Sequence, residues 1–134
     1  MNCLLEEKEK LFQNKLHSEC EIFKISLSYE KIRQLSEKVE KERKCFNQEE
    51  HWKLQEEIKI SFSTFIKKLQ TNCPKLSSGE IVFCCLVKAD IPLSIIIYCM
   101  GNTEMSALKQ RKYRIRDKMR QCQCEELFDS IFKK

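Results

Sequence analysis

A chain of 134 residues is long enough for one ordinary domain, or for a small domain with a helical extension. With 42% hydrophobic and 34% charged residues it has the composition of a folded, helix-rich protein, and two glycines with two prolines are too few for the turns of an all-β fold. The net charge of +5 is modest, but segment 107–120 alone carries seven basic residues and one acid, so the basic character is local. We therefore expect an all-α fold.

The nine cysteines predict neither a disulfide framework nor a metal site. Their number is odd, several lie inside apolar runs such as "VFCCLV", and no Cys-x-x-Cys or histidine pair is present. Reduced thiols imply a cytoplasmic setting. No apolar stretch approaches the roughly 20 residues of a membrane span, and "MNCLLEEKEK" does not resemble a signal peptide.

Catalytic groups are not assembled in any recognisable pattern. His17 and His51 are far apart, and the chain has no glycine-rich phosphate loop and no clustered carboxylates in a predicted cleft. We expect a protein that is not an enzyme, with no cofactor and no small-molecule substrate.

Residues 1–45 carry a weak coiled-coil pattern. One row recurs every seven residues and is interrupted by Ser18; its apolar members are Leu4, Leu11, Ile25, Ile32, Val39 and Phe46. We expect two helices, over 2–24 and 28–43, with Ser28 capping the second. This helical linker is a candidate dimerisation segment, through which the chain would form a homodimer; the alternative is that it folds back onto the rest of the chain.

Residues 46–74 predict one amphipathic connecting helix. Asn47 and Glu50 have the spacing of a capping box, and Pro74 ends the element, so the helix spans about 48–71. His51 is interpreted as a surface residue of the first turn. The side chains expected in the core are Trp52, Leu54, Ile58, Phe62, Phe65, Ile66 and Leu69.

Residues 75–134 predict four short helices. Ser77 and Glu80 form a second capping box for a helix that ends near Lys88, and a helix over 92–100 is stopped by Gly101. Asn102 or Thr103 can cap the third helix, 103–120, and "CEELFDSIF" supplies the last.

The basic stretch "ALKQRKYRIRDKMR" lies on the third of these helices. At 100° per residue, Leu108, Ile115 and Met119 fall within about 20° of each other and form the core stripe. The opposite side carries Ser106, Gln110, Tyr113 and Asp117, with Lys109, Arg114 and Arg116 along its margins. Hydrogen-bonding groups at the centre and cations at the edges are the layout that a major-groove helix needs.

The stretch from "LSSGEIVF" to "RKYRIRDKM" resembles the LuxR-type (GerE-like) helix-turn-helix domain. The ending resembles a signature of the subfamily in which this domain follows tetratricopeptide repeats, a membrane helix and a coiled-coil linker. The resemblance implies a four-helix DNA-binding domain, often dimeric, in a transcriptional regulator. By position, it implies base reading by Lys109, Gln110 and Tyr113. The chain departs from the family pattern at the apolar Ile95–Ile97 of the scaffold helix.

The sequence thus predicts a sequence-specific regulator of transcription that binds double-stranded DNA. The expected base-reading face consists of Ser106, Lys109, Gln110, Tyr113 and Arg114. The expected phosphate contacts are Lys75, Lys88, Thr103, Arg111, Lys112, Arg116 and Lys118. Either a free-standing relative or the output portion of a larger, membrane-tethered sensor fits this pattern. The alternative function is a helical protein–protein interaction module whose basic surface has no specific DNA target.

Overall fold

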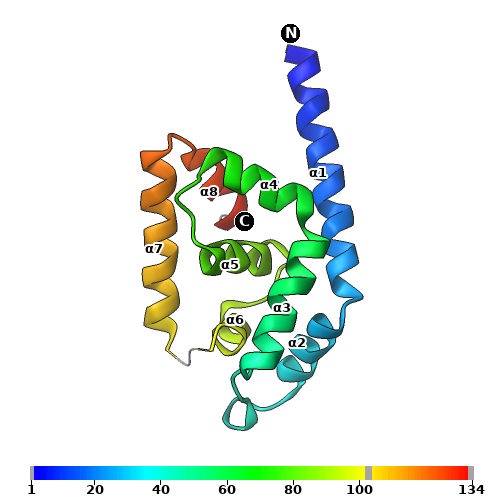
Figure 1. The fold of residues 1–134 in the computed structure, drawn as a ribbon, viewed down its shortest axis with the longest axis vertical. Coiled ribbons are helices and arrows are strands. Elements are labelled where there is room, and N and C mark those ends of the chain that lie inside the picture. The colour runs from blue at the N-terminus through cyan, green and yellow to red at the C-terminus, as the bar shows by residue number, and fades with distance from the viewer. Residues whose placement is uncertain (1, 102–103, 133–134) are drawn as a thin grey trace.

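The computed structural model describes residues 2–101 and 104–132, and within these residues the chain folds into helices alone (Figure 1). The all-α prediction is confirmed. The elements are α1 Asn2–Lys24, α2 Leu27–Glu37, the short 3₁₀ helix η1 Glu40–Glu42, α3 Gln48–Ser61, α4 Ser63–Asn72, α5 Ser78–Lys88, α6 Leu93–Cys99, α7 Met105–Gln121 and α8 Glu125–Phe132.

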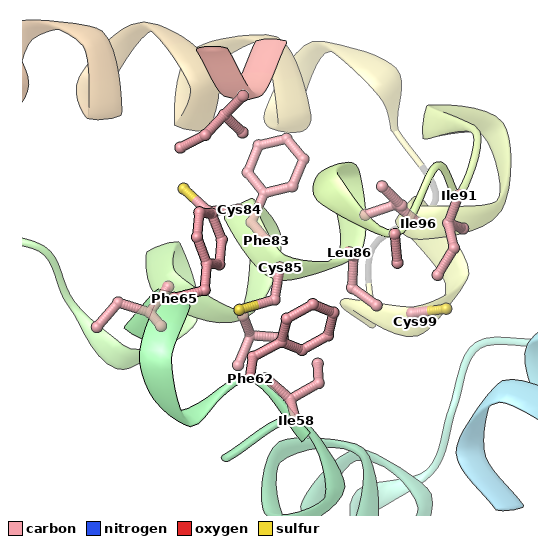
Figure 2. Close-up of a cluster of buried hydrophobic side chains, with 14 of the residues drawn as sticks. Ile58, Phe62, Phe65, Phe83, Cys84, Cys85, Leu86, Ile91, Ile96 and Cys99 are labelled. Atoms are coloured by element: carbon pink, nitrogen blue, oxygen red, sulfur yellow. The ribbon is translucent and has the colours of Figure 1, made fainter. Parts of the chain in front are cut away.

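Helix α5 is the centre of the molecule. It contacts α3 and α4 on one side and α6 and α8 on others, while α7 and α1 lie at opposite edges of the view in Figure 1. Seven consecutive α5 residues, from Glu80 to Leu86, are buried, which is why its apolar positions follow no single stripe. Figure 2 shows the α5 side chains between those of α3, α4 and α6. One hydrophobic cluster includes side chains from α1 through α8.

Three local signals in the sequence are confirmed. Asn47 and Ser77 each cap a helix through a capping box, with Glu50 and Glu80 as the reciprocal partners. Gly101 follows the end of α6 with a φ of 72°, in the left-handed region that glycine adopts without strain. These motifs act within a few residues, so they can be recognised without knowledge of the tertiary structure.

The single helix expected over 48–71 is wrong, because the chain breaks at Phe62 into α3 and α4. The break leaves backbone N–H groups of the first turn of α4 without intrahelical acceptors. Glu19 of α1 satisfies them: its carboxylate accepts from the N–H of Thr64 at 2.8 Å and of Phe65 at 3.1 Å, and from Ser63 Oγ at 3.3 Å. A buried acid from a distant segment therefore caps α4.

A similar contact corrects the start of the second helix. Ser26, and not Ser28, is its N-cap, since the Ser26 side chain accepts from the N–H of Tyr29. Ser28 is buried in the first turn, where its N–H donates to Glu57 of α3 at 2.9 Å. The helix also ends at Glu37, earlier than the expected 43.

Helix α1 packs against α3 and α4 with a face other than the heptad row. Leu16, Glu19 and Phe23 are buried in this contact. Of the heptad row, Ile32 is buried and Phe46 is half-buried, whereas Leu4, Leu11, Ile25 and Val39 are exposed. The N-terminal half of α1 extends beyond the other helices (Figure 1).

Two side chains near the start of α3 are placed differently from expectation. Trp52 is 60% exposed, because the buried row of α3 runs through Leu54 and Ile58 and Trp52 lies on the far side of the helix. His51 occupies the inward position instead and is half-buried. Its Nδ1 lies 3.1 Å from the carbonyl oxygen of Cys99, so it joins α3 to the end of α6.

None of the helices in the described part of the chain combines the length and the apolar character that crossing a membrane requires.

Candidate nucleic-acid interface

The helix expected over 103–120 forms, as α7, between Met105 and Gln121. Its core stripe is confirmed, since Leu108, Ile115 and Met119 are all buried. On this side α7 contacts α6 and α8. The opposite side of α7 therefore faces away from the core along the left edge of Figure 1.

The five residues expected to read bases are all exposed on that outward side. They are Ser106, Lys109, Gln110, Tyr113 and Arg114. Tyr113 is 69% exposed, which is unusual for a large aromatic side chain in a folded protein. Four of the five line one shallow, open depression along the helix. Lys109 and Arg114 lie at opposite margins of this face and have no ion-pair partner among the described residues.

Two of the expected phosphate contacts are instead directed toward α8. Lys112 Nζ lies 5.3 Å from the centroid of the Phe132 ring, and Arg116 Nε lies 3.2 Å from Glu125 Oε1. Arg120 reaches the same oxygen at 2.9 Å. The hydrogen bond from Arg120, supported by Arg116, lowers the pKa of Glu125 from its ordinary value. This margin of α7 is thus used to hold α8.

The other margin of α7 lies against the first turn of α5. Lys118 Nζ is 2.6 Å from Oε1 of Glu80, whose side chain is only 7% exposed. Burial would raise the pKa of Glu80, but the hydrogen bonds from Lys118 and Ser77 outweigh it and the pKa is lowered. The Arg111 guanidinium passes over Gly79, where Nη1 would lie 2.8 Å from an added Cβ. Glycine at this position makes room for Arg111.

The remaining expected phosphate contacts are dispersed. Lys75 is exposed beside the C-terminal end of α7, where its Nζ donates to Gln121 at 3.0 Å. Lys88 lies at the far end of α5 and donates to the carbonyl oxygen of Ser130 at 3.1 Å. Thr103, like the proposed cap at Asn102, lies outside the described residues.

Helix α6 is covered by other helices along most of its length. Ile95, Ile96 and Ile97 are buried, and α6 contacts α2 as well as α5 and α7. Ser94 is the one exposed side chain of this helix. The apolar residues that depart from the family pattern are therefore explained by packing, because α2 covers a second face of α6.

Most basic residues of α7 form two sets. The outward set is Lys109 and Arg114, and the inward set, which contacts α5 or α8, is Lys112, Arg116, Lys118 and Arg120. Sequence spacing identified the outward set, but it missed the acids Glu80 and Glu125 as partners of the inward set. Glu80 was recognisable only as part of a capping box, and no local signal marked Glu125. No group of three or more metal-ligating side chains among the described residues is arranged to hold a metal ion.

Comparison of the chain with models of known protein families, with curated proteins and with solved structures gives no match in any of the three.

Proposed function

We propose that the protein is a sequence-specific DNA-binding regulator of transcription that inserts α7 into the major groove. The observation that carries this proposal is the outward face of α7, where polar side chains are flanked by Lys109 and Arg114, neither of which has an ion-pair partner within residues 2–101 and 104–132. An α-helix fits the major groove of B-DNA, and glutamine and arginine can each make two hydrogen bonds to one base. The LuxR-type identity remains part of this proposal, supported by the motifs quoted above.

Because Lys112, Arg116 and Lys118 have partners within the protein, fewer of the expected residues remain to contact DNA phosphates. Ser77 and Ser78 are exposed at the N-terminal turn of α5, where Arg111 passes over Gly79. Backbone N–H groups and the helix dipole make such a turn favourable for an anion. We assign a DNA phosphate to this turn, with Arg111 and Lys75 beside it. Lys88 is not included, because it lies at the other end of α5, where it donates to the carbonyl oxygen of Ser130.

The first test is selection from a random pool of duplex DNA at two salt concentrations, followed by comparison of two variants. Gln110→Ala is expected to relax the preference at one base position, by roughly tenfold, because one bidentate base contact is worth about 1–3 kcal/mol. Lys75→Ala, at a residue assigned beside the phosphate, is expected to weaken binding to every duplex and to reduce the slope of log K against log salt by about 0.9, the value for one lost phosphate contact.

Lys67→Ala is the matched control, since Lys67 is an exposed lysine on α4, away from α7. Its affinity and sequence preference should match those of the wild type within about twofold. If no motif is recovered and all three variants bind alike, α7 does not read DNA and the proposal is wrong.

The homodimer belongs to the same proposal and is assigned to α1. Three exposed apolar side chains of α1, Leu4, Leu11 and Ile22, fall within about 20° of one another around the helix axis, and the exposed Ile25 follows in the turn after the helix. They lie apart from the buried face that docks on α3 and α4. Apolar side chains exposed in a row along one side of a helix can form an interaction surface when a second copy of the helix covers them. A dimer through α1 would bring two α7 helices to adjacent half-sites.

Sedimentation of the wild type and of Leu11→Glu tests this assignment. We expect a dimer for the wild type and a monomer for the variant, because a charge in the apolar row must be desolvated on association. The control is Ile60→Glu, which alters an exposed isoleucine of α3 and should stay dimeric. A monomeric wild type, or equal dissociation of both variants, would rule out the α1 interface.

The same exposed row supports the second candidate function, a helical module that binds another protein. The same experiments distinguish this function from DNA binding. For a protein-binding module, DNA selection would give no motif. Leu11→Glu would abolish capture of the partner protein, and Gln110→Ala would not.

A further inference from the structure

Two connections that are far apart in the sequence meet at one end of the molecule. The α4–α5 connection and the α7–α8 turn lie side by side, joined by the hydrogen bond from Lys75 to Gln121. A second contact runs from the Cys124 thiol to the carbonyl oxygen of Asn72, at 3.5 Å. In Figure 1 both segments lie at the upper left, beside α8.

Three cysteines gather at this junction. Cys73 follows α4 and is fully buried, Cys124 is buried, and Cys122 is partly exposed. The backbone of Gln123 has a φ of 58°, and the N–H of Cys124 turns back to the carbonyl oxygen of Met119 at 2.8 Å. The turn places Cys122 and Cys124 on either side of Gln123, and the thiols of both lie beside that of Cys73.

The effect of the neighbouring thiols is visible in the acidity of Cys73. Burial, followed by the adjacent thiols of Cys122 and Cys124, raises the pKa of Cys73 to about 12. Cys73 is therefore a protonated thiol at neutral pH and is shielded from solvent. Cys73 is therefore a poor target for a reagent in solution, but it is close enough to attack an oxidised sulfur on a neighbouring cysteine.

We propose that Cys122 and Cys73 are a peroxide-responsive pair that closes into a reversible disulfide. Cys122 is the accessible member and reacts with hydrogen peroxide, and Cys73 is the resolving thiol. Cys124 is the poorer partner for Cys122, because a disulfide between residues separated by a single residue is strained. The arrangement offers two-thiol chemistry and not metal binding, since these thiols do not form a set that could hold a metal ion.

The chemistry balances in two steps. The Cys122 thiolate attacks one oxygen of hydrogen peroxide, the O–O bond breaks, and the hydroxide released takes the former thiol proton as water, leaving a sulfenic acid. The Cys73 sulfur then attacks the sulfenic sulfur and the S–O bond breaks. The hydroxide leaves with the Cys73 proton as a second water. Two thiols are oxidised and one peroxide is reduced, and a dithiol reductant reverses the change by thiol–disulfide exchange.

The bridge would join the C-terminal end of α7 covalently to the α4–α5 connection. This connection contains Cys73 and Lys75 and leads directly into the first turn of α5. In the oxidised state, the C-terminal end of α7 would therefore be held next to the start of α5. Of the other cysteines, Cys84, Cys85 and Cys99 are buried in the core and Cys3 is exposed on α1. Cys20 and Cys45 are partly exposed and lie away from this junction.

The test uses the full chain with Cys3→Ser, which prevents cross-linking through the exposed N-terminal thiol. The reduced protein is treated with a small excess of hydrogen peroxide, alkylated, digested without reduction and mapped by mass spectrometry. We expect one cross-linked peptide pair, containing Cys73 and Cys122, that dithiothreitol separates. In Cys73→Ser, dimedone labelling of Cys122 should rise at least tenfold, because the sulfenic acid is no longer resolved.

Cys99→Ser is the matched control, a buried cysteine away from the junction, and should leave the Cys73–Cys122 cross-link unchanged. The proposal is overturned if no internal disulfide forms, if another pair is linked, or if Cys122 is oxidised no faster than Cys3 in the unaltered chain. The peptide map of the Cys3→Ser protein identifies the linked cysteines by itself. The test of the pairing therefore does not depend on whether Cys73→Ser folds.

Discussion

Phe62→Ala is expected to lower the free energy of unfolding by about 3–5 kcal/mol, the range for deleting a fully buried phenylalanine. Phe62 is the residue at which α3 ends and α4 begins, and it is completely buried. Its ring centroid lies 5.6 Å from that of Phe23 in α1 and 6.2 Å from that of Phe65 in α4. The ring therefore joins three helices, and its loss would leave a cavity where they meet, close to α5 (Figure 2).

Urea denaturation followed by circular dichroism measures this change. Ile60→Ala is the control in the same helix, since Ile60 is 77% exposed and its replacement should alter the free energy of unfolding by about 0.5 kcal/mol or less. A loss for Phe62→Ala within about 1 kcal/mol of the control would show that α1 and α4 do not depend on this ring.

The features that could be predicted from sequence are those whose cause is local. Asn47 and Ser77 cap their helices by reaching backbone groups three residues away, and Gly101 stops α6 through its own φ. The stripe of Leu108, Ile115 and Met119 was predictable because one helix has one period.

The break at Phe62 was not predictable for the opposite reason. The apolar positions of residues 48–71 are compatible with one long helix, and Ser61, Ser63 and Thr64 only weaken it slightly. The deciding group is Glu19, which lies more than forty residues earlier in the chain and supplies acceptors for the start of α4. A pattern within one segment cannot reveal an acceptor that tertiary packing brings to it.

The same distinction applies to the candidate site. A helical wheel places charges around α7, but it does not show which charges meet an acid on another helix. Glu125 engages Arg116 and Arg120, and Glu80 engages Lys118. Part of the basic stretch therefore holds α7 against α5 and α8, which the helical wheel alone does not show.

The Glu80–Lys118 pair joins the first turn of α5 to the side of α7 that lies against it. Glu80 is almost fully buried and also closes the capping box with the N–H of Ser77 at 2.8 Å, while the Lys118 side chain is 30% exposed. Removing one partner of a buried pair leaves the other charge without compensation. Glutamine at this position keeps the size of the side chain and an acceptor for Ser77, so it removes mainly the charge.

Glu80→Gln is expected to lower the free energy of unfolding by about 2–3 kcal/mol at neutral pH, below the range for fully buried pairs because Lys118 is partly hydrated. The pKa of Glu80 in the folded state lies below its ordinary value of 4.5. The carboxylate therefore contributes its stability above pH 4.5, and the contribution is lost as the pH falls through the folded-state pKa. The difference between wild type and variant should be constant between about pH 6 and 8 and shrink below pH 4.5.

Glu50→Gln is the matched control, because Glu50 also closes a capping box and also pairs with a lysine, Lys31, at 2.9 Å. That pair is exposed to solvent, with 45% and 26% of the two side chains accessible, so its loss should cost about 1 kcal/mol or less. Urea denaturation of the three proteins at pH 7 and at about pH 4 separates the cases. An equal loss for both variants would mean that burial of Glu80 adds nothing to its ion pair. A difference from wild type that does not shrink in acid would mean that the carboxylate charge is not what holds α7 to α5.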